Sequence, residues 1–238
     1  FFRMRLIEAR SPADAWIQAS QGLLKEGNNL GDINEILNLV IEIDPRLSFD
    51  KLEDIFDEEF RNIFGDERID YAKSVTFVKP DESPLAPGEF MYKQNDTTVK
   101  WNKTYWGRLI NWHDEFNQIE QVIKRLREGK NSKTIAAQVF DPKSDGRKTM
   151  AGMPCLLSMD FKPRDGELFM TAFFRSQAVS KSGYADYTAL VEMGNFICEQ
   201  TDLILSRVTN IAGSGHIRNQ NNEKKNTIKL LEAVGCVV

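Results

Sequence analysis

Two short apolar runs, each adjoining residues of chemical interest, constrain the fold most. Leu156–Phe161 begins directly after Cys155, and Leu168–Phe174 ends at Arg175 and Ser176. Short apolar runs of this length are typical of buried strands. The sequence therefore predicts two strands, with a cysteine directly before the first and an arginine and a serine directly after the second.

Cys155 is a candidate nucleophile. The preceding Pro154 restricts the backbone, and a loop at the end of a strand holds its side chains close to solvent. An arginine such as Arg175 lowers the pKa of a neighbouring thiol and can also bind a phosphate. The alternative is a small buried hydrophobic residue, which is the usual role of an isolated cysteine.

Composition excludes several other classes of protein. The chain has 238 residues with 41% hydrophobic and 28% charged residues, which is typical of a globular protein. A net charge of −4 gives no electrostatic footprint for nucleic acid. Two histidines and three cysteines without ligand spacing predict no metal site, and they indicate a reducing, cytoplasmic compartment. No apolar run approaches the roughly 18 residues that a membrane helix needs.

The order of periodic segments predicts one α+β domain around a mixed or antiparallel sheet. We expect helices at 12–26, 50–64, 116–128 and 185–201 and near the C-terminus, and strands at 36–43, 134–140, 156–161, 168–176 and 203–212. Residues 66–100 contain three prolines and are expected to be irregular, as a lid would be. The aromatic residues of 101–108 suit either a planar ligand or the core.

Four motifs resemble thymidylate synthase and its nucleotide hydroxymethylase relatives, over about Ala15 to Arg218. The segment 150–155 is similar to the nucleophile motif, and 174–176 to the phosphate-binding Arg-Ser. The segment 215–218 stands where the family has His-x-Tyr, and Glu58, seven residues before Gly65, matches a glutamate that organises catalytic water.

The resemblance implies a homodimer that binds a pyrimidine nucleotide and 5,10-methylenetetrahydrofolate. Cys155 would add to C6 of the base, with Glu58 and Tyr105 moving protons. The further implied roles are phosphate binding by Arg175, Ser176 and the partner subunit's Lys133, sugar binding by His216 and Arg218, and base binding by residue 186.

Departures from the family pattern indicate the substrate. Asp186 replaces an asparagine that reads uracil, and a carboxylate, which only accepts hydrogen bonds, suits the amine of cytosine. Ala178 replaces an aspartate that contacts the folate, so hydride return is in doubt. Lys133 stands where the family has paired arginines, and Arg218 replaces a tyrosine at the sugar, which favours a ribose. The chain thus resembles the mildiomycin type of CMP hydroxymethylase.

Two alternatives remain open at this point. One is an enzyme of the same family that acts on dCMP or on a uridylate. The other is a protein of the same fold that binds a nucleotide without chemistry. Cys198 and Cys236 are expected to be structural, and His113 is expected to lie in a surface loop.

Overall fold

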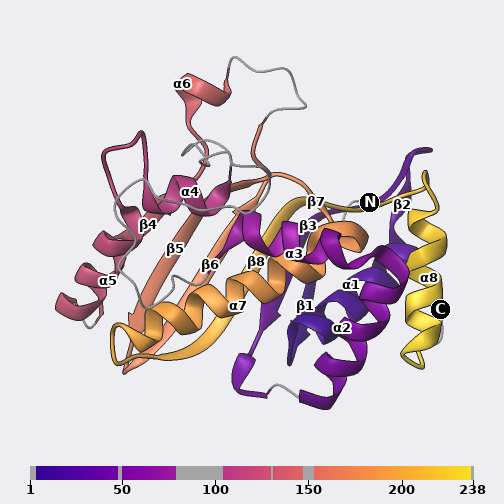
Figure 1. Ribbon diagram of the computed structural model, residues 1–238, viewed down its shortest axis with the longest axis horizontal. Coiled ribbons are helices and arrows are strands. Elements are labelled where there is room, and N and C mark those ends of the chain that lie inside the picture. The colour runs from indigo at the N-terminus through magenta and orange to yellow at the C-terminus, as the bar shows by residue number, and fades with distance from the viewer. Residues whose placement is uncertain (1–3, 48–49, 79–103, 130, 147–152, 237–238) are drawn as a thin grey trace.

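An eight-stranded sheet forms the centre of the computed structural model, which describes residues 4–47, 50–78, 104–129, 131–146 and 153–236 (Figure 1). The strands are β1 (Arg5–Ala9), β2 (Asn28–Asn29), β3 (Ile33–Ile43), β4 (Ile135–Gln138), β5 (Leu156–Arg164), β6 (Glu167–Phe174), β7 (Gln177–Ala178) and β8 (Ile204–Arg218). Their order is β1-β3-β8-β6-β5-β4, with β2 beside β3 and β7 beside β8. The pairs β1/β3, β6/β8 and β7/β8 are parallel and the others antiparallel, which confirms the expected α+β fold with a mixed sheet.

Helices cover one face of this sheet. The helices of the described residues are α1 (Pro12–Glu26), α2 (Asp50–Phe64), α3 (Asp66–Thr76), α4 (Tyr105–Ile110), α5 (Gln118–Glu128), α6 (Pro142–Asp145), α7 (Tyr184–Glu199) and α8 (Glu223–Ala233), with a 3-10 turn at Pro45–Leu47 and a π-helical turn at Val179–Gly183. Figure 1 shows α1, α3 and α7 in front of the strands. None of the helices that the structure describes combines the length and apolar character needed to cross a membrane.

The core lies between the sheet and these helices. Strand residues such as Leu39, Met170 and Val208 are fully buried, and so is Met193 of α7. Each side chain of this size contributes about 1.5–3 kcal/mol when removed from water. Side chains on the other sheet face, such as Phe173, stay partly or fully exposed. The sheet therefore has one covered and one open face.

The helices at 12–26 and 50–64 are confirmed, because α1 and α2 begin and end where the apolar period predicts. Ser11 caps α1 by accepting a hydrogen bond from the Asp14 amide. Trp16 of α1 contacts Phe56 and Phe60 of α2, with ring centroids 5.2 and 5.9 Å apart. The apolar stripe of α2 thus packs on α1.

The expectation of an irregular segment at 66–100 is wrong for its first part, since α3 occupies Asp66–Thr76. Gly65 separates α2 from α3 with a φ of 95°, and two acidic residues in the first turn of α3 favour its start. The three prolines that suggested a loop lie later, outside the described residues, as do Trp101 and the Met150–Gly152 part of the cysteine motif.

β8 continues six residues beyond the predicted strand, through two glycines that allow close approach of its neighbours. A Cβ atom on Gly213 would lie 3.0 Å from the carbonyl oxygen of Arg175, and one on Gly215 would lie 2.5 Å from the Leu39 side chain. Asn38, opposite this point on β3, has a φ of 53°, and the β5/β6 register shifts between Leu156 and Ser158. The sheet is therefore irregular where β5 begins and β6 ends, and the β6/β8 register shifts again between Leu168 and Phe169 at the other end of β6.

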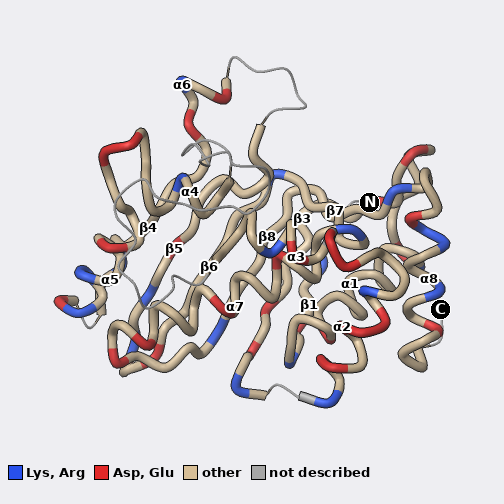
Figure 2. Tube along the Cα trace, in the orientation of Figure 1, with Lys and Arg blue, Asp and Glu red and all other residues tan. Residues whose placement is uncertain are grey.

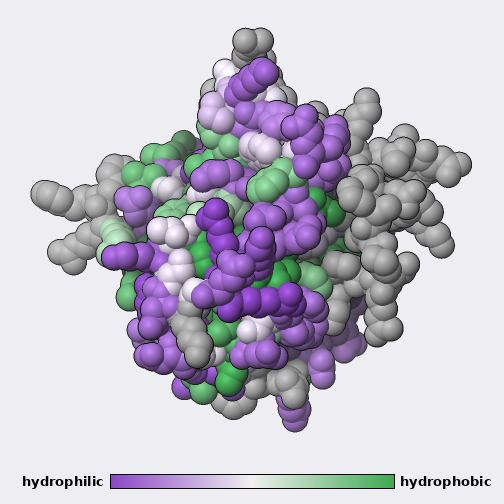
Figure 3. Space-filling view, turned by 90° about the vertical axis from the view of Figure 1, so that its left-hand side faces the viewer, coloured by the Kyte–Doolittle hydropathy of each residue, from purple (hydrophilic) through white to green (hydrophobic). Residues whose placement is uncertain are grey.

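The outer edge of the sheet is closed by a side chain. Gln118 of α5 donates from Nε2 to the carbonyl oxygen of Gln138 at 2.8 Å, and its Oε1 accepts from the Gln138 amide at 2.8 Å. A pocket of about 120 Å³ lies nearby between α5 and β4, lined by residues that include Phe116 and Arg125. Figure 3 views this end of the molecule, where hydrophilic residues predominate among the described ones.

A buried ion pair joins α4 to α6. The Arg108 guanidinium contacts both carboxylate oxygens of Asp145, at 2.5 and 3.0 Å, and also donates to the carbonyl oxygen of Val139 at 2.7 Å. Both side chains are almost completely buried. Elsewhere Lys and Arg alternate with Asp and Glu on the helix surfaces, as Figure 2 shows for α5 and α8.

We expect Asp145→Ala to lower the free energy of unfolding by about 3–5 kcal/mol, because it leaves the buried Arg108 charge without its carboxylate. Urea denaturation of the purified protein measures this change. The control is Glu192→Ala, which breaks the partly exposed pair with Lys73 and should cost at most about 1 kcal/mol. Equal losses in the two variants would contradict the prediction.

Candidate active site

Cys155 lies immediately before β5, at the end of the sheet drawn uppermost in Figure 1. Its amide donates to the Tyr105 hydroxyl oxygen at 3.1 Å, and its carbonyl oxygen accepts from the Arg175 amide at 2.8 Å. Its side chain is half-buried. The predicted nucleophile is therefore held by backbone contacts on both sides while its thiol keeps some access to solvent.

The Arg175 side chain holds the segment that precedes the cysteine. Its Nε donates to the carbonyl oxygen of Pro154 and its Nη2 to that of Met153, both at 3.0 Å. The residue as a whole is exposed. The guanidinium thus supports the cysteine loop through two carbonyl groups and keeps donors that can face an anion.

Tyr105 lies between Cys155 and Asp186, the residue that the sequence predicts to contact the base. It is the first residue of α4, which begins because the Thr104 hydroxyl accepts from the Gly107 amide at 2.8 Å. Burial raises the pKa of Tyr105, and the nearby Cys155 and Asp186 raise it further. The hydroxyl therefore stays protonated at neutral pH and is close to both of these groups.

Asp186, in the first turn of α7, is buried among neutral hydrogen-bond donors. Thr76 Oγ1 donates to its Oδ1 at 3.1 Å, and Gln177 Nε2 donates to its Oδ2 at 3.1 Å. Burial raises the pKa of Asp186 to about 7, although Gln177, Thr76 and Ser182 oppose the rise. Both protonation states of this carboxyl are therefore populated near neutral pH.

His216 and Arg218 follow on β8, and the β7/β8 pairing sets His216 opposite Ala178. The His216 side chain is buried, yet its Nδ1 has no hydrogen-bond partner among the described residues. This ring nitrogen can therefore form a hydrogen bond with a bound group. Burial lowers the pKa of His216, so the ring is neutral at pH 7. Arg218 is exposed at the strand end, and Ser176 is half-buried beside Arg175.

Two predicted residues are not joined to this group. Glu58 is exposed on α2, and no hydrogen bond or ion pair links it to another described residue. Glu53, a half-buried glutamate of α2, accepts from the Ala13 amide at 2.8 Å. The role of Glu58 in catalysis stays a prediction.

Lys133 is exposed in the connection between α5 and β4. The preceding Ser132 accepts a hydrogen bond from Arg164 at 2.9 Å, at the far end of β5 from Cys155. Nine residues of strand span about 30 Å. Lys133 cannot reach the Cys155 site of its own chain, so the predicted contact requires a second subunit.

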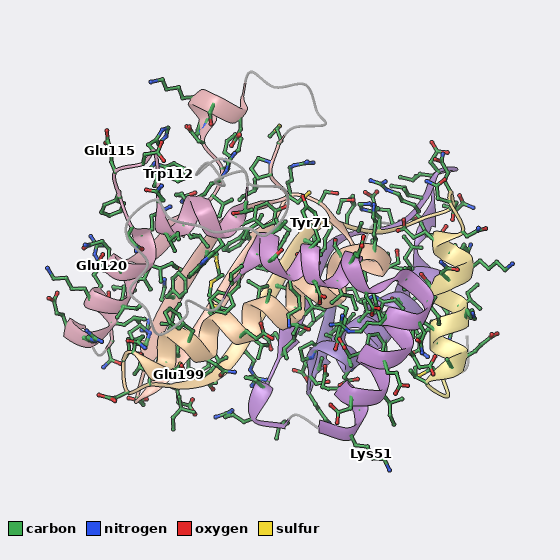
Figure 4. The ribbon with its side chains drawn as sticks, in the orientation of Figure 1. Lys51, Tyr71, Trp112, Glu115, Glu120 and Glu199 are labelled. Carbon is green, nitrogen blue, oxygen red and sulfur yellow. The ribbon has the colours of Figure 1, made fainter. Side chains whose placement is uncertain are left out.

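The remaining reactive residues are placed as structural or surface residues. Cys198 is buried in α7, and burial raises the pKa of its thiol to about 12. Cys236 is half-buried near the C-terminus. His113 lies after α4 at a ring distance of 5.2 Å from Trp112, and Figure 4 shows Trp112 and Glu115 at the periphery of the molecule. Trp106 is buried in the core, whereas 101–103 lie outside the described residues.

Sequence reasoning missed the residues that hold Asp186. Gln177 directly follows the Arg175–Ser176 pair, so its position gave a signal that could have been used. Thr76 gave none, because it lies in the segment that the proline content assigned to a loop. The structure brings together Cys155, Tyr105, Arg175 and Asp186, with His216 on the neighbouring strand.

Comparison with known proteins decides the family. The model of the family described as thymidylate synthase matches residues 65–231, about 70% of the chain. The chain belongs to the thymidylate synthase family. It is 27% identical over 219 residues to a protein of Methanococcoides burtonii named "Putative thymidylate synthase", covering 90% of this chain and 89% of that protein. A protein of the same name from Methanothermobacter marburgensis is 24% identical over 228 residues, covering 91% and 95%.

Membership in the thymidylate synthase family confirms the expected resemblance to that family and the fold it implied. The match begins at Gly65 and so takes in α3 to α8, which include all the residues gathered around Cys155. It does not distinguish hydroxymethylases from synthases, and the substrate therefore has to be argued from the site.

Asp186 can read a base in two ways. When ionised it offers two acceptors, which match the amine of cytosine and not the O4 of uracil. When protonated it offers one donor and one acceptor, as an asparagine does, and this pattern also matches uracil. Since its pKa is about 7, the discrimination against uracil expected from the sequence would apply above neutral pH and weaken below it.

We expect the stability of this protein to fall between about pH 4 and pH 7 because of Asp186. The folded state keeps the carboxyl proton up to its raised pKa of about 7, whereas the unfolded chain releases it at its ordinary value of 3.8. The stabilisation is therefore complete below pH 4 and is lost as the pH rises through 7. Its loss is on the order of 4 kcal/mol at most.

The comparison of wild type with Asp186→Asn measures this loss, because the amide does not titrate. Denaturant unfolding at several pH values should show the free-energy difference shifting in favour of Asp186→Asn from pH 4 to 7 and then remaining constant. A difference that does not change with pH would refute the raised pKa.

Proposed function

We propose that this protein is a folate-dependent enzyme that hydroxymethylates C5 of a cytidine nucleotide, converting CMP to 5-hydroxymethyl-CMP. The observation that carries the proposal is the buried carboxyl of Asp186 beside Tyr105 and Cys155. In a family whose relatives are named as thymidylate synthases, a carboxyl at this position changes the hydrogen-bond pattern offered to the base.

Cys155 is the proposed nucleophile. Its thiolate forms a bond to C6 of the pyrimidine, which makes C5 nucleophilic. Bound 5,10-methylenetetrahydrofolate would supply the one-carbon unit that C5 accepts. Loss of the C5 proton and departure of tetrahydrofolate would leave an electrophilic exocyclic methylene group. Water would then add to this carbon, and the thiolate would leave C6. Tyr105, whose hydroxyl oxygen accepts a hydrogen bond from the Cys155 amide, is suited to transfer the C5 proton.

One feature favours water over hydride as the terminal reactant. Ala178, on β7 opposite His216, provides no carboxylate at the position where the family has one against the folate. Glu58 remains the proposed organiser of the water, although in the described structure its side chain is exposed on α2. Its role requires that the bound form bring α2 and the base together.

The phosphate and the sugar have separate proposed binders. Arg175 and Ser176 lie beside the cysteine and bind the phosphate, together with Lys133 of a second subunit. His216 offers its unpartnered Nδ1 to a sugar hydroxyl, and Arg218 at the strand end supplies a further donor that suits a ribose.

A homodimer is part of the proposal. The open face of the sheet carries Leu6, Val40, Ile211 and Phe173 in one row of paired strands, and these side chains are partly or fully exposed. A row of apolar side chains on a face without helices is typical of a buried interface. Lys133 could complete the phosphate site only across such an interface.

The central test is tritium release from [5-³H]CMP, with [5-³H]dCMP and [5-³H]UMP in parallel, each with and without methylenetetrahydrofolate. We expect folate-dependent release above pH 7 that is fastest with CMP and is abolished by Cys155→Ala, because no C5 proton is lost without the adduct at C6. Cys198→Ala, which removes a thiol outside the site, should retain release.

The other outcomes separate the competing functions. Preferred release from dCMP would assign the deoxyribonucleotide, and preferred release from UMP above pH 7 would assign a uridylate enzyme. Release from none of the three, with binding retained, would indicate a nucleotide-binding protein and overturn the proposal.

We expect Arg175→Lys to reduce kcat/KM for the nucleotide by about 10- to 100-fold, since a lysine cannot contact the Met153 and Pro154 carbonyl groups and an anion together. Steady-state kinetics of tritium release measures the loss. Arg127→Lys, on the exposed part of α5, is the matched control and should leave kcat/KM unchanged. A phosphate role for Arg175 would be refuted if both variants behaved like wild type.

A further inference from the structure

A chain of buried polar side chains ends at Asp186. Gln177 of β7 occupies its centre and is 2% exposed, while Thr76, Tyr187 and Asn210 are fully buried. The position of Gln177 is set by the pairing of β7 with β8 at Gly215, directly after Arg175 and Ser176. A buried amide costs free energy unless each of its polar atoms is hydrogen-bonded. Apolar residues would fill the same space without this cost, so the network suggests a role beyond packing.

The Gln177 amide has one favourable orientation. Its Oε1 accepts from the Tyr187 hydroxyl at 3.2 Å and from Asn210 Nδ2 at 3.0 Å. With the oxygen occupied by these two donors, the Nε2 group donates to Asp186 at 3.1 Å and, at the longer distance of 3.4 Å, to Asn210 Oδ1. The network on the core side of Gln177 thus determines that Asp186 receives a donor.

The groups that face Asp186 are neutral. They are Thr76 from α3, Tyr105 from α4, Ser182 from the π-helical turn, Gln177 from β7 and Tyr187 from α7. No lysine, arginine or histidine of the described chain contacts the carboxyl. Lys73, one turn before Thr76, is paired with Glu192 at 2.7 Å. Hydrogen bonds therefore oppose the effect of burial without help from a cation.

We propose that Gln177 is a specificity-determining positioning residue, whose amide orients the Asp186 carboxyl and favours its ionised form, and so favours cytosine over uracil. The proposal rests on the function proposed above, because it assigns Asp186 to the base. The reason is the difference between the two forms of the carboxyl, since only the protonated form can donate to O4 of uracil.

The first test follows Asp186 directly in the ligand-free protein, by NMR titration of ¹³Cγ-labelled aspartate with the signal assigned from Asp186→Asn. Gln177→Met removes the donor and should raise the titration midpoint of Asp186 by about one pH unit, a tenfold change in its ionisation ratio. Gln177→Glu, which keeps the acceptor for Tyr187 and Asn210 but removes the donor, should raise it as well and serves if Gln177→Met does not fold.

Tyr187→Phe is the matched control, because it alters the same network on the other side of Gln177 and leaves the donor to Asp186 in place. Its Asp186 midpoint should equal that of wild type. The proposal is overturned if Gln177→Met and Gln177→Glu titrate as wild type does, or if Tyr187→Phe shifts the midpoint as much as they do.

The second test measures base selection by calorimetric binding of CMP and UMP, which needs no folate and no turnover. At pH 8 a midpoint raised by one unit increases the ratio of protonated to ionised Asp186 about tenfold, so UMP should bind Gln177→Met about tenfold more tightly relative to CMP. An unchanged CMP-to-UMP ratio would overturn the selective role of Gln177. Absence of tritium release with these shifts intact would instead contradict only the proposed reaction.

Discussion

The close approach of β8 to β3 and to the segment after β6 is the constraint on which the site depends. Gly213 and Gly215 have no side chains between these neighbours, and larger residues would collide with the Arg175 carbonyl oxygen or with Leu39. Because β8 can run on past Gly213, β7 pairs with it, and Arg175, Gln177 and His216 become neighbours. The chemistry of the site thus rests on two positions where the absence of a Cβ atom decides the packing.

The site combines a rigid sheet with a buried polar group whose charge is finely balanced. Removing Asp186 from water favours its neutral form, whereas the donors Gln177 and Thr76 favour its charge, and the result is a pKa of about 7. A guanidinium at this place would have kept the carboxylate ionised over the whole physiological range. The neutral surroundings instead leave the group sensitive to single hydrogen bonds, which is the physical basis of the role inferred for Gln177.

Much of the fold could be predicted from the sequence, because α1, α2, α5, α7, β5 and β6 each carry a strong apolar period or run. The helix at Asp66–Thr76 could not be predicted, because its few apolar residues form no clear period and are recognisable as core residues only from their packing against α7. The cysteine, the arginine and Asp186 were found through family spacing, which also set Glu58 and Lys133 in the site. In the structure Glu58 lies on an exposed helix face, and Lys133 lies at the far end of β5. The spacing of residues along the chain predicts neither the exposure of Glu58 nor the distance of Lys133 from Cys155. Thr76 and Gln177 escaped notice because their importance comes from burial beside Asp186.

The amide of Gln118 has a consequence for assembly. An edge strand with free amide and carbonyl groups invites another strand to extend the sheet, and Gln118 occupies both such groups of Gln138. Strand addition at Gln138 is therefore hindered by a single side chain. The homodimer proposed above would use the broad surface of the sheet instead, and a pair formed face to face is closed.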